Sequence, residues 1–566
     1  MSSLLTSLLH LFGLLVFIAS WLSYDHYRPW VNFHAEALAV LAIWFLAVSR
    51  ATLAFSGKAP LAAPRRIGWL LIIAIIPWLQ WLAGTALFAG DALLASLYVC
   101  ALVLSVVVAY SYALDLEPAD GLTAIFFAVW SVALISAAIG LLQWLELQEH
   151  FGMYVVQTDL GDRAMGNLGQ PNQLATLLLM GMVSLAWIYE RKLIGPIGLA
   201  AGVSFLTLVL VLTQSRAGMV SLLAIALYLV WKTKSHGMRL RPRHIAIWAA
   251  CYLIVVQCLP WVHDALLMVD SRNMSLLRDN GRILIWKQVW AGVLQSPWIG
   301  YGWNQTPTAH AAGAVSFPGS LTYTNAHNAV LDLMAWVGIP IALLITLGCF
   351  FWIVSRLWSA VHVDSVLALS GLVPIVIHSM LEYPFAYAYF LVTGGLFIGI
   401  AEARHYVRTQ NYIVSMRAFT LLLVIWAVVG CRVVYEYALV EEDFRVVRFE
   451  NLRIGQTPSD YVPPQKIWLL SQLGTMLNAS RIQPSRNMTA IEMEILRTAS
   501  LRFAYGALGL RYAIALGLNG EPEAATYQMR IVRGMYGEYY YRAAVSVLRA
   551  MENEKYPELN AVLTNE

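Results

Sequence analysis

Thirteen apolar runs, separated by polar segments that are mostly short, occupy most of the first 434 residues of the chain. A helix of about 17–25 residues crosses the hydrocarbon core of a bilayer. The eighth run, 217–231, is the shortest of the thirteen. The runs cover about 3–23, 35–50, 67–89, 92–113, 121–143, 173–189, 193–213, 217–231, 245–263, 328–355, 361–381, 386–402 and 417–434. The sequence therefore predicts an all-α polytopic membrane protein with about 13 transmembrane helices.

The composition excludes several other classes of protein. The 566 residues are 59% hydrophobic and only 12% charged, whereas an average soluble protein is about 25% charged. The net charge of +4 gives no reason to expect nucleic acid as a partner. The five cysteines lie in or beside apolar runs and lack zinc-ligand spacing, so we interpret them as small apolar residues. The first basic residue, Arg28, follows the first apolar run, and we interpret that run as a retained span rather than a cleaved signal peptide.

The distribution of lysine and arginine predicts the orientation of the chain in the membrane. Loops on the cytoplasmic side of a bilayer carry an excess of basic residues. Alternate loops hold fifteen of them, namely Arg50, Lys58, Arg65, Arg66, Arg191, Lys192, Lys232, Lys234, Arg239, Arg241, Arg243, Arg356, Arg404, Arg408 and Arg417. The opposite, longer loops hold only Arg28, Arg163, Arg216, Arg272, Arg278, Arg282 and Lys287. The N-terminus is thus predicted to be cytoplasmic and the tail to lie on the far side, with every basic residue in a loop or in the tail.

The far side of the membrane is predicted to carry the functional segments. We expect a transmembrane domain over 1–434, which includes a long far-side loop over 264–327, and a helical domain over 435–566 on the same side. Loops of such length are usually functional or disordered. In the long loop, Trp286, Val289 and Trp290 recur at helical spacing and predict an amphipathic helix.

The tail has the pattern of a soluble helical region. Apolar residues recur at helical spacing over 491–518, a turn follows at 519–522, and Pro522 begins a second helix that we expect to extend to about 536. The small residues around this turn resemble a tetratricopeptide-like repeat. The alternative is a small helical bundle, because one such repeat cannot bury its own apolar face.

Two polar motifs lie at the outer ends of spans six to eight. The segment Gly-Asn-Leu-Gly-Gln-Pro-Asn-Gln over 166–173 contains Gln170 and Asn172. Its amides suit a hydroxyl-rich ligand such as a sugar, and the alternative is a helix start capped by Asn172. Arg216 follows in Ser-Arg-Ala-Gly over 215–218, where its guanidinium is either an anion clamp or reaches to the membrane interface.

Two further clusters belong to the long loop and the segment before span ten. Arg278, Arg282 and Trp286 are four residues apart and share one helix face, which is either a diphosphate site or a solvated basic surface. His327 ends the loop and precedes Asn328 at an expected helix start. An unperturbed imidazole titrates near pH 6.5, so His327 is a candidate general acid or base.

The last candidate site is the outer turn between spans eleven and twelve. His378 and Glu382 are one helical turn apart and can pair, and Tyr383 can donate a hydrogen bond. The alternative is a polar helix end followed by a proline stop. The chain has no metal-ligand or nucleotide-binding motif, so we expect neither a metal nor another cofactor.

Taken in order, the motifs resemble a known family. They are Pro29-Trp30, Phe33 and Glu36, then the segment 166–173, Ser-Arg-Ala-Gly, Gly281-Arg282 with Trp286, Gly-Tyr-Gly-Trp-Asn over 300–304, His327-Asn328 with Gly338, and His-Ser-Met-Leu-Glu-Tyr-Pro over 378–384. This order is similar to that of the bacterial protein O-oligosaccharyltransferases of the PglL kind, within the superfamily of O-antigen ligases and polymerases. The resemblance extends over nearly the whole chain.

The resemblance implies a function and a set of site residues. The family transfers a glycan en bloc from undecaprenyl diphosphate to a serine or threonine hydroxyl of a periplasmic protein, often a type IV pilin, at the periplasmic face of the inner membrane. The resemblance would make the far-side loop over 264–327 and the helical domain over 435–566 periplasmic. His327 matches the family's essential loop histidine, and Arg216 and Arg282 match its diphosphate-binding arginines. Gln170 and Tyr383 match positions that are tied to activity in the pilin-directed enzymes.

Two alternatives to protein glycosylation remain open from the sequence. An O-antigen ligase or a polymerase acts on the same lipid-linked glycan and shares the superfamily motifs. A transporter of lipid-linked glycan would instead show internal repeats and charges inside its spans, and the sequence shows no convincing repeat.

Overall fold

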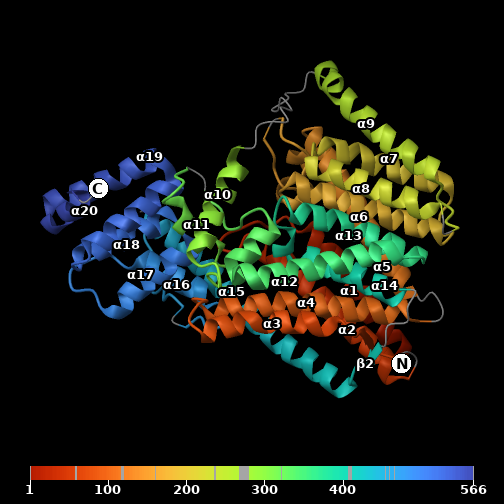
Figure 1. Cartoon of the computed structure of the whole chain (residues 1–566), viewed down its shortest axis with the longest axis horizontal. Coiled ribbons are helices and arrows are strands. Elements are labelled where there is room, and N and C mark those ends of the chain that lie inside the picture. The colour runs from red at the N-terminus through yellow and green to blue at the C-terminus, as the bar shows by residue number, and fades with distance from the viewer. Residues whose placement is uncertain are drawn as a thin grey trace. The chain divides into compact units, whose positions relative to one another are not determined.

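The structure is a computed structural model that describes residues 2–57, 60–115, 120–159, 161–234, 237–266, 280–319, 322–405, 411–452, 454–457, 459–464 and 466–564 (Figure 1). Helices make up nearly all of its regular structure. The first half contains α1 (Ser2–Leu22), α2 (Phe33–Phe55), α3 (Ile67–Leu82), α4 (Ala89–Ala113), α5 (Asp120–Trp144), η1 (Gln148–Tyr154), η2 (Gly166–Leu168), α6 (Pro171–Glu190), α7 (Pro196–Leu212), α8 (Arg216–Thr233) and α9 (Pro242–Ala265).

The second half is also helical. It contains α10 (Asn280–Gln295), α11 (Thr306–Ala314), α12 (Ala329–Ser359), α13 (Val363–Ser379), η3 (Pro384–Ala386), α14 (Ala388–Ala403), α15 (Met416–Leu452), α16 (Ser471–Arg481), α17 (Ala490–Phe503), α18 (Gly506–Leu518), α19 (Pro522–Glu554), η4 (Pro557–Leu559) and α20 (Asn560–Thr564). The sequence did not indicate the one small sheet, in which β1 (Ala62–Pro64) pairs antiparallel with β2 (Asn411–Ile413).

Every predicted span coincides with a helix. In the described part of the chain, nine helices are long and apolar enough to cross a membrane: α1, α2, α4, α5, α6, α8, α9, α12 and α15. The other four predicted spans are the shorter apolar helices α3, α7, α13 and α14. The helical, multi-pass membrane architecture is confirmed, whereas the number of 13 crossings stays a prediction.

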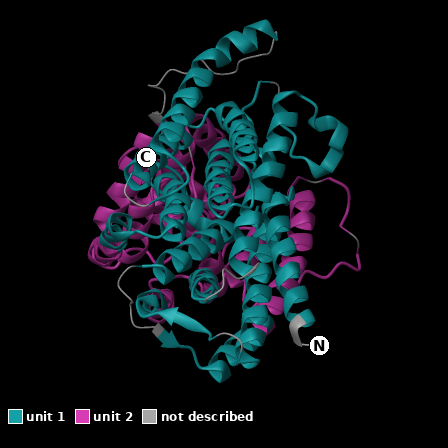
Figure 2. Cartoon of the chain, turned by 90° about the vertical axis from the view of Figure 1, so that its right-hand side faces the viewer, with its two compact units in different colours: residues 1–72, 98–276, 349–427 teal, residues 73–97, 277–348, 428–566 magenta. Residues whose placement is uncertain are grey.

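Packing divides the chain into two compact units (Figure 2). Unit 1 consists of residues 1–72, 98–276 and 349–427, and unit 2 consists of residues 73–97, 277–348 and 428–566. This division follows contacts within the chain. The predicted domains, 1–434 and 435–566, follow the side of the membrane instead, and they stay a prediction.

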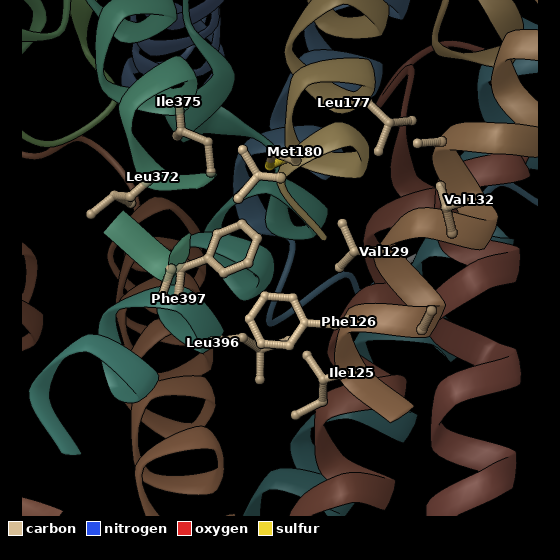
Figure 3. Packing of buried hydrophobic residues seen from close by; sticks show 14 of the residues in the cluster. Ile125, Phe126, Val129, Val132, Leu177, Met180, Leu372, Ile375, Leu396 and Phe397 are labelled. Atoms are coloured by element: carbon tan, nitrogen blue, oxygen red, sulfur yellow. The ribbon is translucent and has the colours of Figure 1, made fainter. Parts of the chain in front are cut away.

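Four helices build the core of unit 1: α6 packs against both α5 and α13, and α13 packs against α14. Side chains from α5, α6, α13 and α14 meet there, and the ring of Phe126 stacks on that of Trp187 with 4.4 Å between centroids. Figure 3 labels ten of these residues: Ile125, Phe126, Val129, Val132, Leu177, Met180, Leu372, Ile375, Leu396 and Phe397. Small residues permit the close approach, because a Cβ on Gly181 would lie only 2.2 Å from that of Ala133.

Buried ion pairs lie at helix ends of unit 1. The guanidinium of Arg50 is 0% exposed and donates to both carboxylate oxygens of Asp115 at 2.8 and 2.9 Å. The guanidinium of Arg356 is paired in the same way with Glu402, at 2.5 and 3.0 Å. Pairing of this kind compensates for the removal of each charge from water.

These pairs correct one expectation from the sequence. Arg50, Lys232, Arg356 and Arg432 lie inside α2, α8, α12 and α15, and not in loops. For Lys232 and Arg356 the reason is that the helix continues beyond the apolar run that predicts it, whereas Arg50 and Arg432 already lie within the predicted runs 35–50 and 417–434. Arg432 pairs with Glu436 one turn further along α15, at 2.9 Å.

In unit 2, helix α12 is interrupted at Gly338, where the sequence had predicted an unbroken span. Gly338 has φ 77° and ψ 167°, outside the helical region. The carbonyls of Ala335 and Trp336 accept hydrogen bonds from the N–H groups of Tyr301 and Gly302, at 2.8 and 3.0 Å. The segment Gly-Tyr-Gly-Trp-Asn therefore pairs the backbone groups that the break releases, as a membrane segment requires.

The C-terminal helices form a further part of unit 2. The turn predicted at 519–522 joins α18 to α19, and α19 is interrupted at Gly537, close to the predicted end at 536. The helical pattern over 491–518 is divided into α17 and α18 at Ala504, which has φ 45°. Consecutive helices contact one another from α16 to α19. A tetratricopeptide-like arrangement stays a prediction.

Replacement of Gly338 by alanine is expected to destabilise the protein. A Cβ at this position would lie 2.4 Å from the carbonyl oxygen of Trp298, and the backbone conformation disfavours any side chain. We expect a loss of about 1–3 kcal/mol, measured as a lower Tm of the purified protein in detergent.

Gly348→Ala on the same helix is the matched control, because a Cβ there meets nothing within 4 Å. Its expected effect is neutral or slightly stabilising. Equal Tm values for the two variants would contradict the role of Gly338.

Candidate active site

His327 occupies an unusual backbone position in unit 2. Its φ is 55°, in the left-handed region that residues other than glycine seldom adopt. Next to it, the Asn328 side chain accepts hydrogen bonds from the N–H groups of Val330 and Leu331, both at 3.1 Å, and so caps α12. The expected position of His327 immediately before a helix start is confirmed.

The residue before His327 is held on both of its backbone groups. Ala326 is fully buried, its N–H donates to Oδ1 of Asp332 at 2.8 Å, and its carbonyl accepts from the indole of Trp286 at 2.9 Å. The left-handed conformation of His327 is therefore supported by fixed neighbours on α10 and α12. Strained backbone of this kind is concentrated at functional sites.

The imidazole of His327 is half-buried rather than enclosed. The ring of Tyr323 meets it edge to face, with centroids 5.0 Å apart. A partly exposed imidazole on a fixed backbone can accept a proton from a bound hydroxyl group or orient that group.

An apolar groove of about 410 Å³ lies beside this loop. Its lining comes from α10 and the start of α12: Ile283, Trp286, Lys287, Trp290, Asn328, Val330, Leu331 and Met334. The predicted amphipathic helix is confirmed as α10, with Val289 buried and Trp290 exposed. Arg282 lies in the first turn of α10 and is half-buried, one turn from Trp286, whereas Arg278 lies outside the described residues.

A second histidine of unit 2, His310, is more deeply buried than His327. His310 on α11 is fully buried, and its Nε2 lies 2.8 Å from Oε1 of Gln288. Burial lowers the pKa of His310 to about 4, because the protonated form loses its hydration. His310 is thus a neutral residue of the packed interior, and it leaves His327 as the imidazole of this unit that reaches the surface.

The segment 166–173 builds a polar cluster in unit 1. Asn172 accepts a hydrogen bond from Oγ of Ser215 at 2.7 Å and donates to Oε1 of Glu382 at 3.4 Å. The alternative that Asn172 caps α6 is wrong, because Gln170 occupies the cap position and makes no side-chain cap. Asn172 instead links the starts of α6 and α8 to the turn after α13.

His378 belongs to the same cluster. Its Nδ1 lies 3.0 Å from Oγ1 of Thr176, whose hydroxyl also donates to the carbonyl of Asn172 at 3.0 Å. His378 and Glu382 are joined by a backbone hydrogen bond, in which the Glu382 N–H donates to the His378 carbonyl at 2.8 Å. A side-chain pair between the two stays a prediction.

Arg216 is exposed at the first position of α8. Among the residues that the structure describes, it has no carboxylate partner. The start of a helix carries partial positive charge, which adds to that of the guanidinium and favours an anion. Tyr383 is half-buried, and its ring centroid lies 5.7 Å from that of Tyr387.

The predicted site residues are thus divided between the two units. Unit 1 contains Gln170, Asn172, Arg216, His378 and Tyr383, and unit 2 contains Arg282, Trp286 and His327. In unit 1, hydrogen bonds link Asn172 to His378 through Thr176, and in unit 2, Trp286 donates to the carbonyl of Ala326, the neighbour of His327.

The sequence missed the residues that support these networks. Gln143 accepts from the N–H of Gly166 at 2.8 Å and so shapes the turn that precedes α6, but nothing in its surroundings marks it. Thr306 donates to Asp332 at 2.7 Å and was missed for the same reason. Asp332 did carry a signal, as a lone carboxylate in an apolar run.

Comparisons with known proteins identify the class. Family models described as "Protein glycosylation ligase", "O-Antigen ligase" and "Virulence factor membrane-bound polymerase, C-terminal" match residues 164–189, 201–347 and 366–550. The chain is 27% identical to the general O-oligosaccharyltransferase of Acinetobacter baylyi over 94% of its own length and 93% of that protein's. It is also 27% identical to the ComP-specific O-oligosaccharyltransferase of the same organism, over 69% of each chain.

These matches place the chain among the multi-pass membrane enzymes of the O-antigen ligase family. Within that family it belongs to the O-oligosaccharyltransferases of the PglL type. The resemblance drawn from the sequence motifs is confirmed.

The state of His310 predicts a dependence of stability on pH. Because its pKa falls from 6.5 in the unfolded chain to about 4 in the folded protein, the unfolded state binds the proton first. The contribution is complete above pH 6.5 and is lost as the pH falls toward 4, by about 3 kcal/mol in total.

The measurement is the Tm of the purified protein in detergent at pH 7.5 and at pH 4.5. His310→Gln should reduce the difference between the two values, while His244→Gln at an exposed position of α9 should leave it unchanged. The same pH difference in all three proteins would refute the assignment.

Proposed function

We propose that this protein transfers a glycan en bloc from undecaprenyl diphosphate to serine or threonine hydroxyl groups of periplasmic proteins, with type IV pilins among its acceptors. Membership of the PglL-type family supports the activity. The observation on which the chemistry depends is the half-exposed His327, held in a left-handed conformation beside an apolar groove.

In the proposed reaction, His327 takes the proton of the acceptor hydroxyl or orients that hydroxyl for attack. The hydroxyl oxygen bonds to the anomeric carbon of the glycan, and the bond from that carbon to the diphosphate oxygen breaks. A fixed backbone favours this role, because an oriented base removes much of the entropic cost of the step.

We propose that Arg216 and Arg282 bind the diphosphate as it leaves. Negative charge grows on its oxygens in the transition state, and a guanidinium fork matches the geometry of phosphate oxygens. The exposed position of Arg216 at the start of α8 supports this role. Arg278 is proposed to contribute to the same anion site.

The remaining residues are proposed to bind substrate. Gln170, Asn172 and Tyr383 supply amide and hydroxyl groups for the sugar or the acceptor, and His378 supports Asn172 through Thr176. Trp286 borders the apolar groove, which suits the polyprenyl chain of the donor. No cofactor is needed for a transfer from an activated lipid diphosphate.

The proposed location is the bacterial inner membrane, with the site facing the periplasm. In this proposal about 13 helices span the bilayer within residues 1–434, the 264–327 loop is periplasmic, and residues 435–566 form a periplasmic helical domain of tetratricopeptide-like kind. The excess of basic residues in alternate loops supports this orientation.

A second candidate function is ligation or polymerisation of O-antigen. The match of residues 201–347 to the O-antigen ligase model favours it. The two functions differ in the acceptor, which is a protein in one case and a lipid or a growing glycan in the other.

His327→Ala is expected to lower glycan transfer at least 100-fold, because removal of a general base typically costs 10²–10⁴-fold. The assay is the intact mass of a co-expressed pilin, which gains the mass of one glycan when transfer occurs. Export of lipid-linked glycan without any modified protein would support a transporter instead.

His244→Ala is the matched control, since His244 is exposed on α9. It should retain full transfer at equal protein level. Near wild-type transfer by His327→Ala would refute the proposed role of the histidine.

Arg282→Lys is expected to lower transfer about tenfold or more, although the positive charge is kept. Lysine cannot form the paired hydrogen bonds of a guanidinium fork with a diphosphate. The control is Arg243→Lys at an exposed position of α9, which should be neutral. Unchanged transfer by Arg282→Lys would indicate that Arg282 is part of a solvated basic surface.

A further inference from the structure

A buried chain of polar side chains connects the His327 loop to the C-terminal helices, entirely within unit 2. Its members come from four segments that are distant in sequence: α4, α11, α12 and α17. Asp91, Gln305, Thr306 and Asp332 are buried, and the side chain of Arg502 is 17% exposed.

The first link joins the loop to α11. Oδ1 of Asp332 is shared, since it accepts from the Ala326 N–H at 2.8 Å and from the Thr306 hydroxyl at 2.7 Å. The indole of Trp336 donates to the same hydroxyl at 2.7 Å. Thr306 is only 1% exposed, so water cannot replace the hydroxyl in this arrangement without a rearrangement of the interior.

The second link joins α11 to α17. Gln305, the neighbour of Thr306 in sequence, donates to Oδ2 of Asp91 at 3.3 Å. Arg502 donates to both oxygens of Asp91, at 2.7 and 2.9 Å. Asp91 is 1% exposed, and Arg502 supplies the positive charge that balances this buried carboxylate.

A separate contact holds the same two helices together. The hydroxyl oxygen of Thr308 lies 3.1 Å from the carbonyl oxygen of Leu501 and 3.1 Å from Oε1 of Gln305, two acceptors that share its single proton. The start of α11 therefore contacts α17 directly through Thr308 and indirectly through Asp91 of α4. Because α11 carries Thr306, the position of α17 determines where the hydroxyl meets Asp332.

We propose that Thr306 and Asp332 are positioning residues for His327, and that the C-terminal helix α17 holds them in place through Arg502. The inference rests on the proposed role of His327 in glycan transfer. It gives the C-terminal region a part in the chemical step, in addition to any contact with acceptor proteins. Loss of one link lets the left-handed backbone at His327 relax, which moves the imidazole away from the reacting hydroxyl.

The first test compares Thr306→Val with Thr306→Ser in the full-length protein, with lipid-linked glycan and a pilin acceptor. Valine keeps the shape of threonine but removes the hydroxyl, whereas serine keeps the hydroxyl. We expect Thr306→Val to lower kcat about tenfold with little change in the KM for the acceptor. Thr306→Ser should restore kcat to within about twofold of the wild type.

The second test concerns α17. Arg502→Gln is expected to lower kcat, and Arg497→Gln is its matched control on the same helix, where Arg497 pairs with Glu494 at the surface. Hydrogen exchange gives a readout that does not depend on activity. The peptide that contains Ala326 should exchange faster in Thr306→Val and in Arg502→Gln than in Arg497→Gln.

The outcomes separate this inference from the proposed function. If His327→Ala abolishes transfer while Thr306→Val keeps the wild-type kcat and exchange rate, the positioning role is wrong and the function stands. If His327→Ala keeps full transfer, the proposed role of the histidine fails first. A Thr306→Ser variant as slow as Thr306→Val would also overturn the inference, because the hydroxyl would then not be the group that matters.

Discussion

The interior of a bilayer offers no water, so every backbone N–H and C=O group there must find a partner within the protein. Continuous helices satisfy this requirement, and they account for almost all of the regular structure. The requirement also explains the break in α12. At Gly338 the helix releases the carbonyls of Ala335 and Trp336, and the N–H groups of Tyr301 and Gly302 pair with them. The need to pair backbone groups therefore explains both the Gly-Tyr-Gly-Trp-Asn segment over 300–304 and its contact with the helix break at Gly338, more than 30 residues further along the chain.

The same absence of water governs the charges. In unit 1, Arg50 and Arg356 are enclosed, and each forms a two-point ion pair with a carboxylate, Asp115 or Glu402. In unit 2, Arg502 does the same for Asp91. Arg216, in contrast, is exposed at a helix start and has no carboxylate partner among the described residues. Arginines that stabilise the fold are thus distinguished from an arginine that is available to an anionic ligand.

The two histidines of unit 2 show how environment assigns a role. His310 is buried, and its low pKa keeps it neutral, which suits a residue of the interior. His327 is half-exposed on a strained backbone that Ala326, Asp332 and Trp286 hold in place. In the proposed mechanism, this strained conformation presents the imidazole to the acceptor hydroxyl in one orientation. The groove that borders Trp286 offers room for the lipid of the proposed donor at the same place.

The sequence by itself determined the location of the apolar helices, the amphipathic helix α10, the turn before α19 and the start of α12 beside His327. These features depend on local composition and periodicity, which neighbouring residues share. The tertiary structure alone decided that Asn172 meets Ser215 and Glu382, that Thr306 and Asp332 support the His327 loop, and that α17 reaches α11. Such contacts join residues tens to hundreds of positions apart, and a hydrogen bond between distant segments leaves no periodic pattern in either of them. The break at Gly338 belongs to the second group, because an apolar run looks continuous until another segment takes its backbone hydrogen bonds.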